Sequence, residues 1–262
     1  MSRILLSRRR IIGMGVLGTT SLALSGCDQF DFLGRTDSTA RAILEKTNSL
    51  TYHAQRLLIR DGGLAPEYSE SEIRQGQRPN GSRDPDTPEY AALKANHFAD
   101  YRLTVKGLVE QPRTYSLTEL RNMPSRTQIT RHDCVEGWSC IAKWTGTPLS
   151  KLLDEAKLKP AARYLVFHCY DRFDDVSGPA SYYESCDLVD ARHPQTILAY
   201  GLNGEALPVA NGAPIRVRIE RALGYKQPKY VHTIEAVDSF SGFGLGKGGY
   251  WEDRGYDWYA GI

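Results

Sequence analysis

Between residues 131 and 139 the chain places one thiol, that of Cys134, among charged and aromatic side chains. A thiolate is a soft ligand and a good nucleophile, so this segment could do chemistry in two ways. Cys134 could bind a metal cofactor, or it could act as a nucleophile assisted by His132. It could also be a buried structural cysteine, the usual role of a single Cys, or form a disulfide with Cys140 in an oxidising compartment. The local residues alone leave these roles open.

Short runs of alternating or apolar residues predict the strands around this segment. A polar, β-rich run at 127–130 leads directly to Cys134, and on a strand His132 and Asp133 would point to opposite faces. The other predicted strands lie at 101–109, 164–168, 197–200, 215–219 and 230–237. Asn203-Gly204 is a strong hairpin signal. Because helices do not alternate regularly with these strands, the sequence predicts an α+β domain with mixed β-sheets and surrounding helices.

Three helices are predicted. An amphipathic helix at 38–60 ends before Gly62-Gly63. A helix at 116–122 opens with a capping-box pattern, with Ser116 as N-cap and Glu119 three residues later. A third, at 147–156, has a proline in its first turn. Residues 67–88 are polar and rich in turn-forming residues, which predicts either irregular chain wrapping the main domain or a disordered linker.

The N-terminus has the pattern of an export signal. Ser7-Arg8-Arg9-Arg10-Ile11-Ile12 resembles a twin-arginine motif, and the apolar run 11–24 is short for a membrane-spanning helix. The run ends in Leu24-Ser25-Gly26-Cys27, which resembles a bacterial lipobox; an ordinary signal peptide cleaved nearby is the alternative. Asp28 resembles an inner-membrane retention signal. These patterns predict periplasmic export by the twin-arginine route and a lipid anchor in the inner membrane through Cys27.

The composition is that of a soluble globular protein, with 41% hydrophobic and 24% charged residues. The net charge of +2 is misleading because four arginines lie in the export signal, and without them 29 basic and 31 acidic residues remain. Bulk charge therefore gives no indication of nucleic-acid binding. The chain has no Cys-x-x-Cys-His sequence, so no covalent c-type haem is expected.

Cys134-Val135-Glu136-Gly137-Trp138-Ser139 resembles the molybdenum-ligating cysteine segment of the sulfite oxidase family of molybdopterin enzymes. The resemblance covers most of 90–255 and implies a molybdenum–molybdopterin cofactor with Cys134 as the metal ligand. Twin-arginine export carries folded proteins, which suits an enzyme that takes up its cofactor in the cytoplasm. The stretch after the cysteine lacks the basic residues with which sulfite oxidases hold sulfite. It looks more like the branch that contains the periplasmic methionine sulfoxide reductase catalytic subunit.

The resemblance also implies roles for other residues. Asn211 would contact the pterin edge, and Arg216 would hold the cofactor's phosphate. Tyr182 corresponds to the family's active-site tyrosine, with a packed core tyrosine as the alternative. Asn96 corresponds to an early pterin contact, or is simply a turn or helix cap. The lysines of 224–229, including Lys226, belong to a loop that holds the pterin and its phosphate. The remaining implied cofactor contacts are His97, Cys169 (where Thr or Ser is more usual), Gln227, Pro228 and Lys229.

The resemblance thus implies a periplasmic oxidoreductase that couples oxygen-atom transfer on a small S- or N-oxide-type substrate to two-electron redox chemistry. A separate electron-transfer partner, a membrane cytochrome or quinone-linked protein, is implied. The expected organisation is a signal with lipobox at 1–27, a tether, amphipathic helix and irregular wrap at 28–89, and the molybdopterin-binding oxidoreductase domain at 90–262. The family's dimerisation domain is not expected, which favours a monomer. The alternatives are a Cys-dependent hydrolase using Cys134 and His132, and a non-catalytic lipoprotein binding module.

Overall fold

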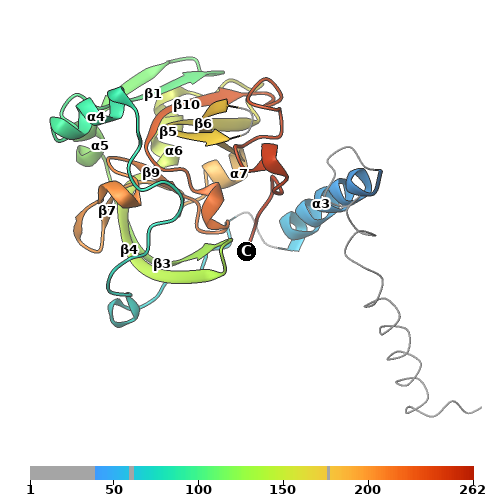
Figure 1. Cartoon of the computed structure of the whole chain (residues 1–262), viewed down its shortest axis with the longest axis horizontal. Coiled ribbons are helices and arrows are strands. Elements are labelled where there is room, and N and C mark those ends of the chain that lie inside the picture. The colour runs from blue at the N-terminus through green and yellow to red at the C-terminus, as the bar shows by residue number, and fades with distance from the viewer. Residues whose placement is uncertain (1–38, 59–61, 176–177) are drawn as a thin grey trace, which may run out of the picture. The chain divides into compact units, whose positions relative to one another are not determined.

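The computed structural model describes residues 39–58, 62–175 and 178–262 (Figure 1). The twin-arginine and lipobox patterns therefore lie outside the described residues. Contacts divide the chain into two units, Met1–Thr51 and Tyr52–Ile262. Helix α3 (Thr39–Leu58) crosses this division and confirms the helix predicted at 38–60. Within these described ranges, no helix is both long and apolar enough to cross a bilayer.

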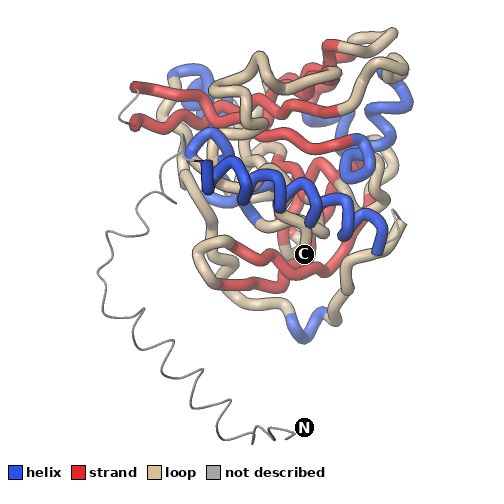
Figure 2. The backbone as a smooth tube through the Cα atoms, turned by 90° about the vertical axis from the view of Figure 1, so that its right-hand side faces the viewer, coloured by secondary structure: helices blue, strands red, loops and turns tan. Residues whose placement is uncertain are grey.

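The first of two β-sheets in the second unit is mixed, with the strand order β2-β1-β10-β5-β6 (Figures 1 and 2). Strands β1 and β10 pair in parallel, and the other neighbours pair antiparallel. The strands are β1 (Arg102–Gly107), β2 (Arg113–Ser116), β5 (Tyr164–Asp175), β6 (Gly178–Asp187) and β10 (Val231–Val237). This mixed pairing, with short helices around it, confirms the predicted α+β class.

The second sheet carries the segment around Cys134. Its order is β3-β4-β7-β8, with β9 paired to β7. The strands are β3 (Arg126–Cys134), β4 (Trp138–Pro148), β7 (Ile197–Leu202), β8 (Glu205–Ala206) and β9 (Arg216–Arg218). Strands β3 and β4 form a long hairpin whose last pair is Cys134 and Trp138. Along β3 His132 is buried and Asp133 is partly exposed, so the alternation predicted for this strand is present.

Helices and tight turns connect these strands. The turn between β7 and β8 is the predicted hairpin, with left-handed φ angles at Asn203 and Gly204. Helix α6 begins two residues later than predicted, because Thr147 and Pro148 still pair with β7 as the end of β4. After α3, the described helices are η2 (Glu70–Glu72), α4 (Pro88–Ala95), α5 (Leu117–Asn122), α6 (Leu149–Ala156), α7 (Leu188–Ala191), η3 (Val209–Asn211), η4 (Gly224–Lys226) and η5 (Glu252–Arg254).

Two hydrophobic clusters stabilise the second unit. The larger cluster joins the first sheet to α6, and its fully buried members include Val105, Leu152, Phe167 and Ile234. The smaller one lies on the second sheet around Trp144. The guanidinium groups of Arg216 and Arg218 lie over the Trp144 ring, 5.1 and 4.3 Å from its centroid. The second sheet therefore holds two buried cations against its small core.

The segment at 62–87 follows the second sheet before α4 begins (Figure 1, teal). The amide of Tyr68 donates to the carbonyl of Ile129 at 2.9 Å, and the amide of Arg74 donates to that of Ile141 at 3.1 Å. These backbone hydrogen bonds fix the segment to β3 and β4. The predicted domain boundaries at 27 and 89 stay predictions.

The predicted capping box at the start of α5 gives a test of local stability. The Ser116 hydroxyl accepts from the Glu119 amide at 3.2 Å, and the Ser116 amide donates to the Glu119 carboxylate at 2.7 Å. Ser116→Ala should lower the free energy of unfolding by about 1 kcal/mol in urea denaturation, because the Glu119 amide loses its hydroxyl acceptor. Thr118→Ala, at an exposed position in the same helix, is the control and should change it much less. Equal effects of the two substitutions would contradict this account.

Candidate active site

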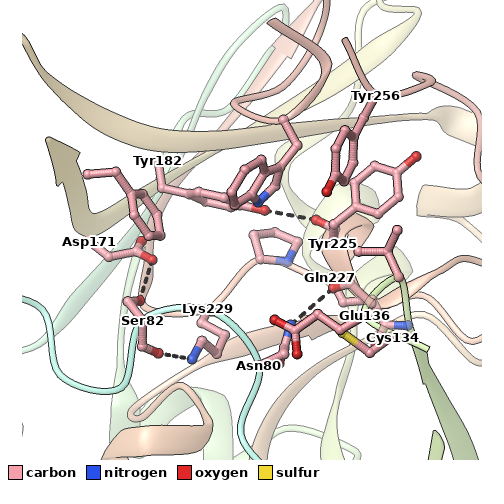
Figure 3. Close-up of a pocket in the computed structure, with 16 residues that line it drawn as sticks. Asn80, Ser82, Cys134, Glu136, Asp171, Tyr182, Tyr225, Gln227, Lys229 and Tyr256 are labelled. Carbon is pink, nitrogen blue, oxygen red and sulfur yellow. Dashed lines mark hydrogen bonds between the residues drawn. The ribbon is translucent and has the colours of Figure 1, made fainter. Parts of the chain in front are cut away.

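Cys134 lies at the tip of the β3–β4 hairpin. The loop 135–137 closes with Gly137 at a φ of 82°, and the Gly137 amide donates to the Cys134 carbonyl at 3.0 Å. The thiol is only 9% exposed and lines a cavity of about 120 Å³ (Figure 3). Tyr182 lines the same cavity. The hairpin thus presents a single buried thiol to a space that a small group could enter.

The surroundings of this thiol do not activate it as a nucleophile. Burial raises the pKa of the Cys134 thiol above its ordinary value. His132 accepts a hydrogen bond at Nδ1 from Arg218 at 2.7 Å, and burial followed by Arg218 lowers its pKa well below the usual range. A base so engaged is poorly placed to take a proton from Cys134, which disfavours the hydrolase alternative. The described cysteines are free thiols, and Cys140 contacts Arg74 at 3.6 Å.

Two buried cations meet beside the cavity, and their hydrogen-bond partners are neutral. Arg216 donates to the carbonyls of Asn211 and Gln227 at 3.0 and 3.3 Å. Lys229 donates to the carbonyls of Ala210, at 3.0 Å, and Ser82. Burial, then the Arg216 charge, lowers the pKa of Lys229 to about 7, while burial, then Arg218, lowers the pKa of Arg216 to about 9. Such a pair of charges is a site for an anion such as a phosphate.

Several buried polar atoms around these cations have no hydrogen-bond partner among the residues that the structure describes. Two of them are the donors Asn211 Nδ2 and Arg216 Nε. Since Arg218 donates to His132 Nδ1, the neutral imidazole carries its proton on Nε2. This proton is directed at the Gln227 side chain, with which His132 interacts, so Asn211 Nδ2 and Arg216 Nε are the donors left for a bound group. Buried polar groups are rarely left unpaired, so this arrangement fits a bound group with a hydrogen-bonding edge and an anionic end, as a pterin phosphate has.

Two glycines allow this close packing. A Cβ atom at Gly212 would lie 3.0 Å from the Lys229 side chain and 3.1 Å from that of Arg216. A Cβ atom at Gly224 would lie 2.6 Å from the His132 ring. Only a residue without a side chain fits at either position without displacing these groups.

Sequence reasoning missed Asn80 and Ser82, which reach the cavity from the segment at 62–87. Asn80 accepts from Arg216 at Oδ1 and donates from Nδ2 to the Gly224 carbonyl, each at 3.5 Å. The Ser82 hydroxyl donates to Asp171 at 2.8 Å (Figure 3). Both residues lie in the polar stretch 67–88, whose turn-forming composition predicts only irregular chain or a linker. No local signal separates an asparagine that turns the chain from one that also contacts a ligand.

The structure brings together some of the predicted cofactor residues. Gln227, Pro228 and Lys229 line the cavity with Cys134 and Tyr182, and Asn211 lies beside Arg216. The Tyr182 hydroxyl donates to the Tyr225 carbonyl at 2.8 Å (Figure 3). The phenol is therefore oriented by the same loop that carries the cavity-lining residues 227–229.

Other predicted contacts lie elsewhere. Asn96 caps the end of α4 and donates to Asp100 at 2.6 Å, while His97 is exposed. Neither lines the cavity, and the helix-cap alternative describes Asn96. Cys169 is buried in β5 and lines a different cavity of about 570 Å³, which shares Tyr182 with the first. The pairing of β5 with β6 shifts register between His168 and Arg172, and across this irregularity Asp171 faces the first cavity while Cys169 lies in the core.

Lys226, expected to hold the cofactor, is instead buried between Glu184 and Glu252, which lies 2.5 Å away. Burial alone would lower the pKa of Lys226, and the two carboxylates more than reverse this effect. This ion pair ties the segment around η5 to β6. It leaves Lys229 as the lysine of the loop that faces the cavity.

The depressed pKa of Lys229 gives a pH test on cofactor-free protein. The unfolded chain keeps this proton up to about pH 10.5, whereas the folded chain releases it near pH 7. Stability should therefore rise with pH between these values. Lys229→Met should abolish this contribution to the pH dependence of the free energy of unfolding. Measured by urea unfolding, the free energy of unfolding of wild type should therefore rise by up to about 4 kcal/mol relative to that of the variant from pH 7 to pH 10. Lys151→Met, at an exposed site, is the control. An unchanged pH slope in Lys229→Met would contradict the assignment.

Comparisons with known proteins identify the family. Residues 90–242 match the oxidoreductase molybdopterin binding domain. The chain is 36% identical over 245 residues to the Azospira oryzae protein named "Putative protein-methionine-sulfoxide reductase subunit YedZ1", covering 94% of this chain and 84% of that one. It is 35% identical over 165 residues to the Ralstonia nicotianae protein-methionine-sulfoxide reductase catalytic subunit MsrP, covering 60% of this chain but only 49% of that one. The sulfane dehydrogenase SoxCD from Paracoccus pantotrophus matches with 26% identity and a TM-score of 0.47, over 54% of this chain and 39% of that one. The chain therefore belongs to the sulfite oxidase family of molybdopterin-binding oxidoreductases, and it is an enzyme with a molybdopterin cofactor.

Proposed function

We propose that this enzyme is a periplasmic reductase that removes the oxygen atom from a sulfoxide, with methionine sulfoxide as the first candidate. The observation that carries the proposal is the lining of the cavity beside Cys134. It combines aromatic rings with Glu136 and Asp171, and Lys229 is its one cation among the lining residues described. Such a lining disfavours a doubly charged anion such as sulfite and suits a neutral sulfoxide. The names of the two relatives support the same substrate.

The residues of the chain divide into a ligand, a cradle and a pocket. Cys134 would ligate the metal, and Arg216 and Lys229 would hold the phosphate. Asn211 would bind the polar edge of the pterin, with Asn80 closing the site from the segment at 62–87. When bound, the cofactor supplies two-electron oxygen-atom transfer. The Tyr182 hydroxyl donates its one proton to the Tyr225 carbonyl, so the Tyr182 ring would form a wall of the substrate pocket.

Sulfoxide reduction consumes two electrons and two protons and releases water, so we infer a separate electron donor. The names of both relatives describe subunits, which supports a partner protein, and a membrane cytochrome or quinone-linked protein fits an enzyme held at the inner membrane. The monomeric state and the absence of nucleic-acid binding stay predictions from the sequence.

Substitution of Cys134 tests this function. Purified holoenzyme should contain near-stoichiometric molybdenum and should oxidise a reduced viologen dye when methionine sulfoxide is added. Cys134→Ser should lower turnover at least about a hundredfold, equal to about 2.7 kcal/mol of barrier, and change the molybdenum spectrum, while much of the pterin stays bound. Cys140→Ser, at another buried thiol, is the control and should keep the native spectrum. Metal-free folded protein, or an unchanged spectrum in Cys134→Ser, would refute the proposal.

The proposed location has its own test. Because Leu24-Ser25-Gly26-Cys27 ends the apolar run, Cys27→Ser should release the protein into the soluble periplasm or leave it unprocessed. The measurement is fractionation of cells followed by immunoblotting, with export through the twin-arginine route verified separately in a double substitution of Arg8 and Arg9 to Lys. A normally processed Cys27→Ser protein that stays with the membranes would exclude the lipid anchor.

A further inference from the structure

Three charged side chains line the cavity beside Cys134, and they have different tasks. Lys229 lies next to Arg216 in the anion cradle, where a cofactor phosphate would offset both cations. Among the lining residues described, Asp171 has Lys229 as a cationic neighbour, whereas Glu136 has no cation beside it within the lining. Once the cradle is filled, the charge that a substrate meets in this cavity is therefore negative.

Glu136 is held at the same end of the cavity as Cys134 (Figure 3). Its carboxylate accepts from the Trp138 indole at 2.8 Å, so the hairpin that carries the thiol also fixes this charge. Arg78 lies 3.9 Å from the carboxylate and stacks over the Trp138 ring at 5.0 Å. The Arg78 and Glu136 side chains are each about half exposed, so water screens the interaction between them, and of the two only Glu136 lines the cavity.

Asp171 contributes a second, deeper carboxylate. It is 3% exposed, accepts from the Ser82 hydroxyl at 2.8 Å, and keeps Oδ1 without a partner among the residues described. Burial raises its pKa to about 6, so at pH 7 it is mostly ionised. The Lys229 ammonium is its cationic neighbour and lowers this pKa, so a phosphate that engages Lys229 would raise the pKa of Asp171 further and favour its neutral form.

The remaining walls are aromatic. Phe173 packs on Tyr182 with ring centroids 5.8 Å apart, and Trp251 stacks on Tyr256 at 5.4 Å. Ring faces attract cations and accept a methyl group or sulfur atom, whereas they give nothing to an anion. An aromatic cavity with the Glu136 carboxylate at its edge is complementary to a small group that carries or adjoins a positive charge.

We propose that this cavity selects sulfoxides that carry a positive charge close to the sulfoxide, and that Glu136 determines this preference. The inference rests on the proposed function and narrows its substrate class. In a peptide, the preferred site is a methionine sulfoxide at an amino terminus or beside a lysine or arginine. A carboxylate in the same place is disfavoured.

The test compares three substrates with the same sulfoxide at pH 7. They are methionine sulfoxide amide, which is a cation, N-acetylmethionine sulfoxide amide, which is neutral, and N-acetylmethionine sulfoxide, which is an anion. Wild-type holoenzyme should show the highest kcat/KM for the cation and the lowest for the anion. Glu136→Gln should reduce the cation-to-anion ratio by about three- to tenfold, mainly through KM, because one charge a few ångströms from the substrate is lost.

Two further variants separate this effect from general damage to the protein. Arg78→Gln should raise the ratio, because it removes the opposing charge beside Glu136. Glu110→Gln removes an exposed carboxylate from the turn between β1 and β2 and should leave the ratio unchanged. Molybdenum content and spectrum should stay native in all three variants. Equal ratios in wild type and Glu136→Gln, or the same shift in Glu110→Gln, would overturn the inference.

Binding measured without turnover keeps the inference distinct from the proposed function. Calorimetry of the oxidised holoenzyme with methionine amide, N-acetylmethionine amide and N-acetylmethionine tests the same charge series on the thioethers. A cation preference that depends on Glu136 supports the inference even if no sulfoxide is reduced, an outcome that would refute only the proposed function. Tight binding of the anion, in preference to the cation, would overturn the inference whatever the activity.

Discussion

The two buried cations of Arg216 and Lys229 set the constraint on which the rest of the site depends. Removing such charges from water costs several kcal/mol each unless an opposite charge or oriented dipoles replace the water. Here the nearest partners are carbonyls, which orient toward the cations without neutralising them. The pKa of each cation is lowered for the same reason, since its hydrogen-bond partners carry no opposite charge to replace the water that burial removes. The fold around them is therefore built to hold an anion, and its stability is linked to the presence of that anion.

This constraint explains why distant segments of the chain converge. Strand β9 pairs with β7 and buries Arg216 against Trp144, while the loop after η4 returns Lys229 to the same place. Gly212 permits the two side chains to meet. The segment at 62–87, which precedes the matched family domain, supplies Asn80 as an amide bridge. The two cations, the glycine that lets them approach and the asparagine that closes the site thus come from different elements, and Asn80 is far from the others in the sequence.

The sequence predicted those features whose cause is local. The capping box at Ser116, the Asn203-Gly204 turn and the alternation along β3 each depend on a few neighbouring residues, and the structure confirms them. The start of α6 was placed too early because the end of β4 pairs with a strand fifty residues away. Lys226 and Lys229 are equivalent in the sequence, yet one faces two buried carboxylates and the other faces the cavity. Asn80 lines the cavity and Asn96 caps α4, because the tertiary path of the chain decides which amide reaches the site.

The β3–β4 hairpin carries both the proposed metal ligand and the charge proposed to select the substrate. Its tip carries Cys134, while two residues later it carries Glu136, held by Trp138. The anion cradle lies on β9 and the 224–229 loop and makes no use of the Glu136 side chain. Substitution at the hairpin tip can therefore change which substrate enters without disturbing how the cofactor is held. Because this charge is two residues from the metal ligand, it lies at short range from a substrate at the metal, although water screens the half-exposed carboxylate in part.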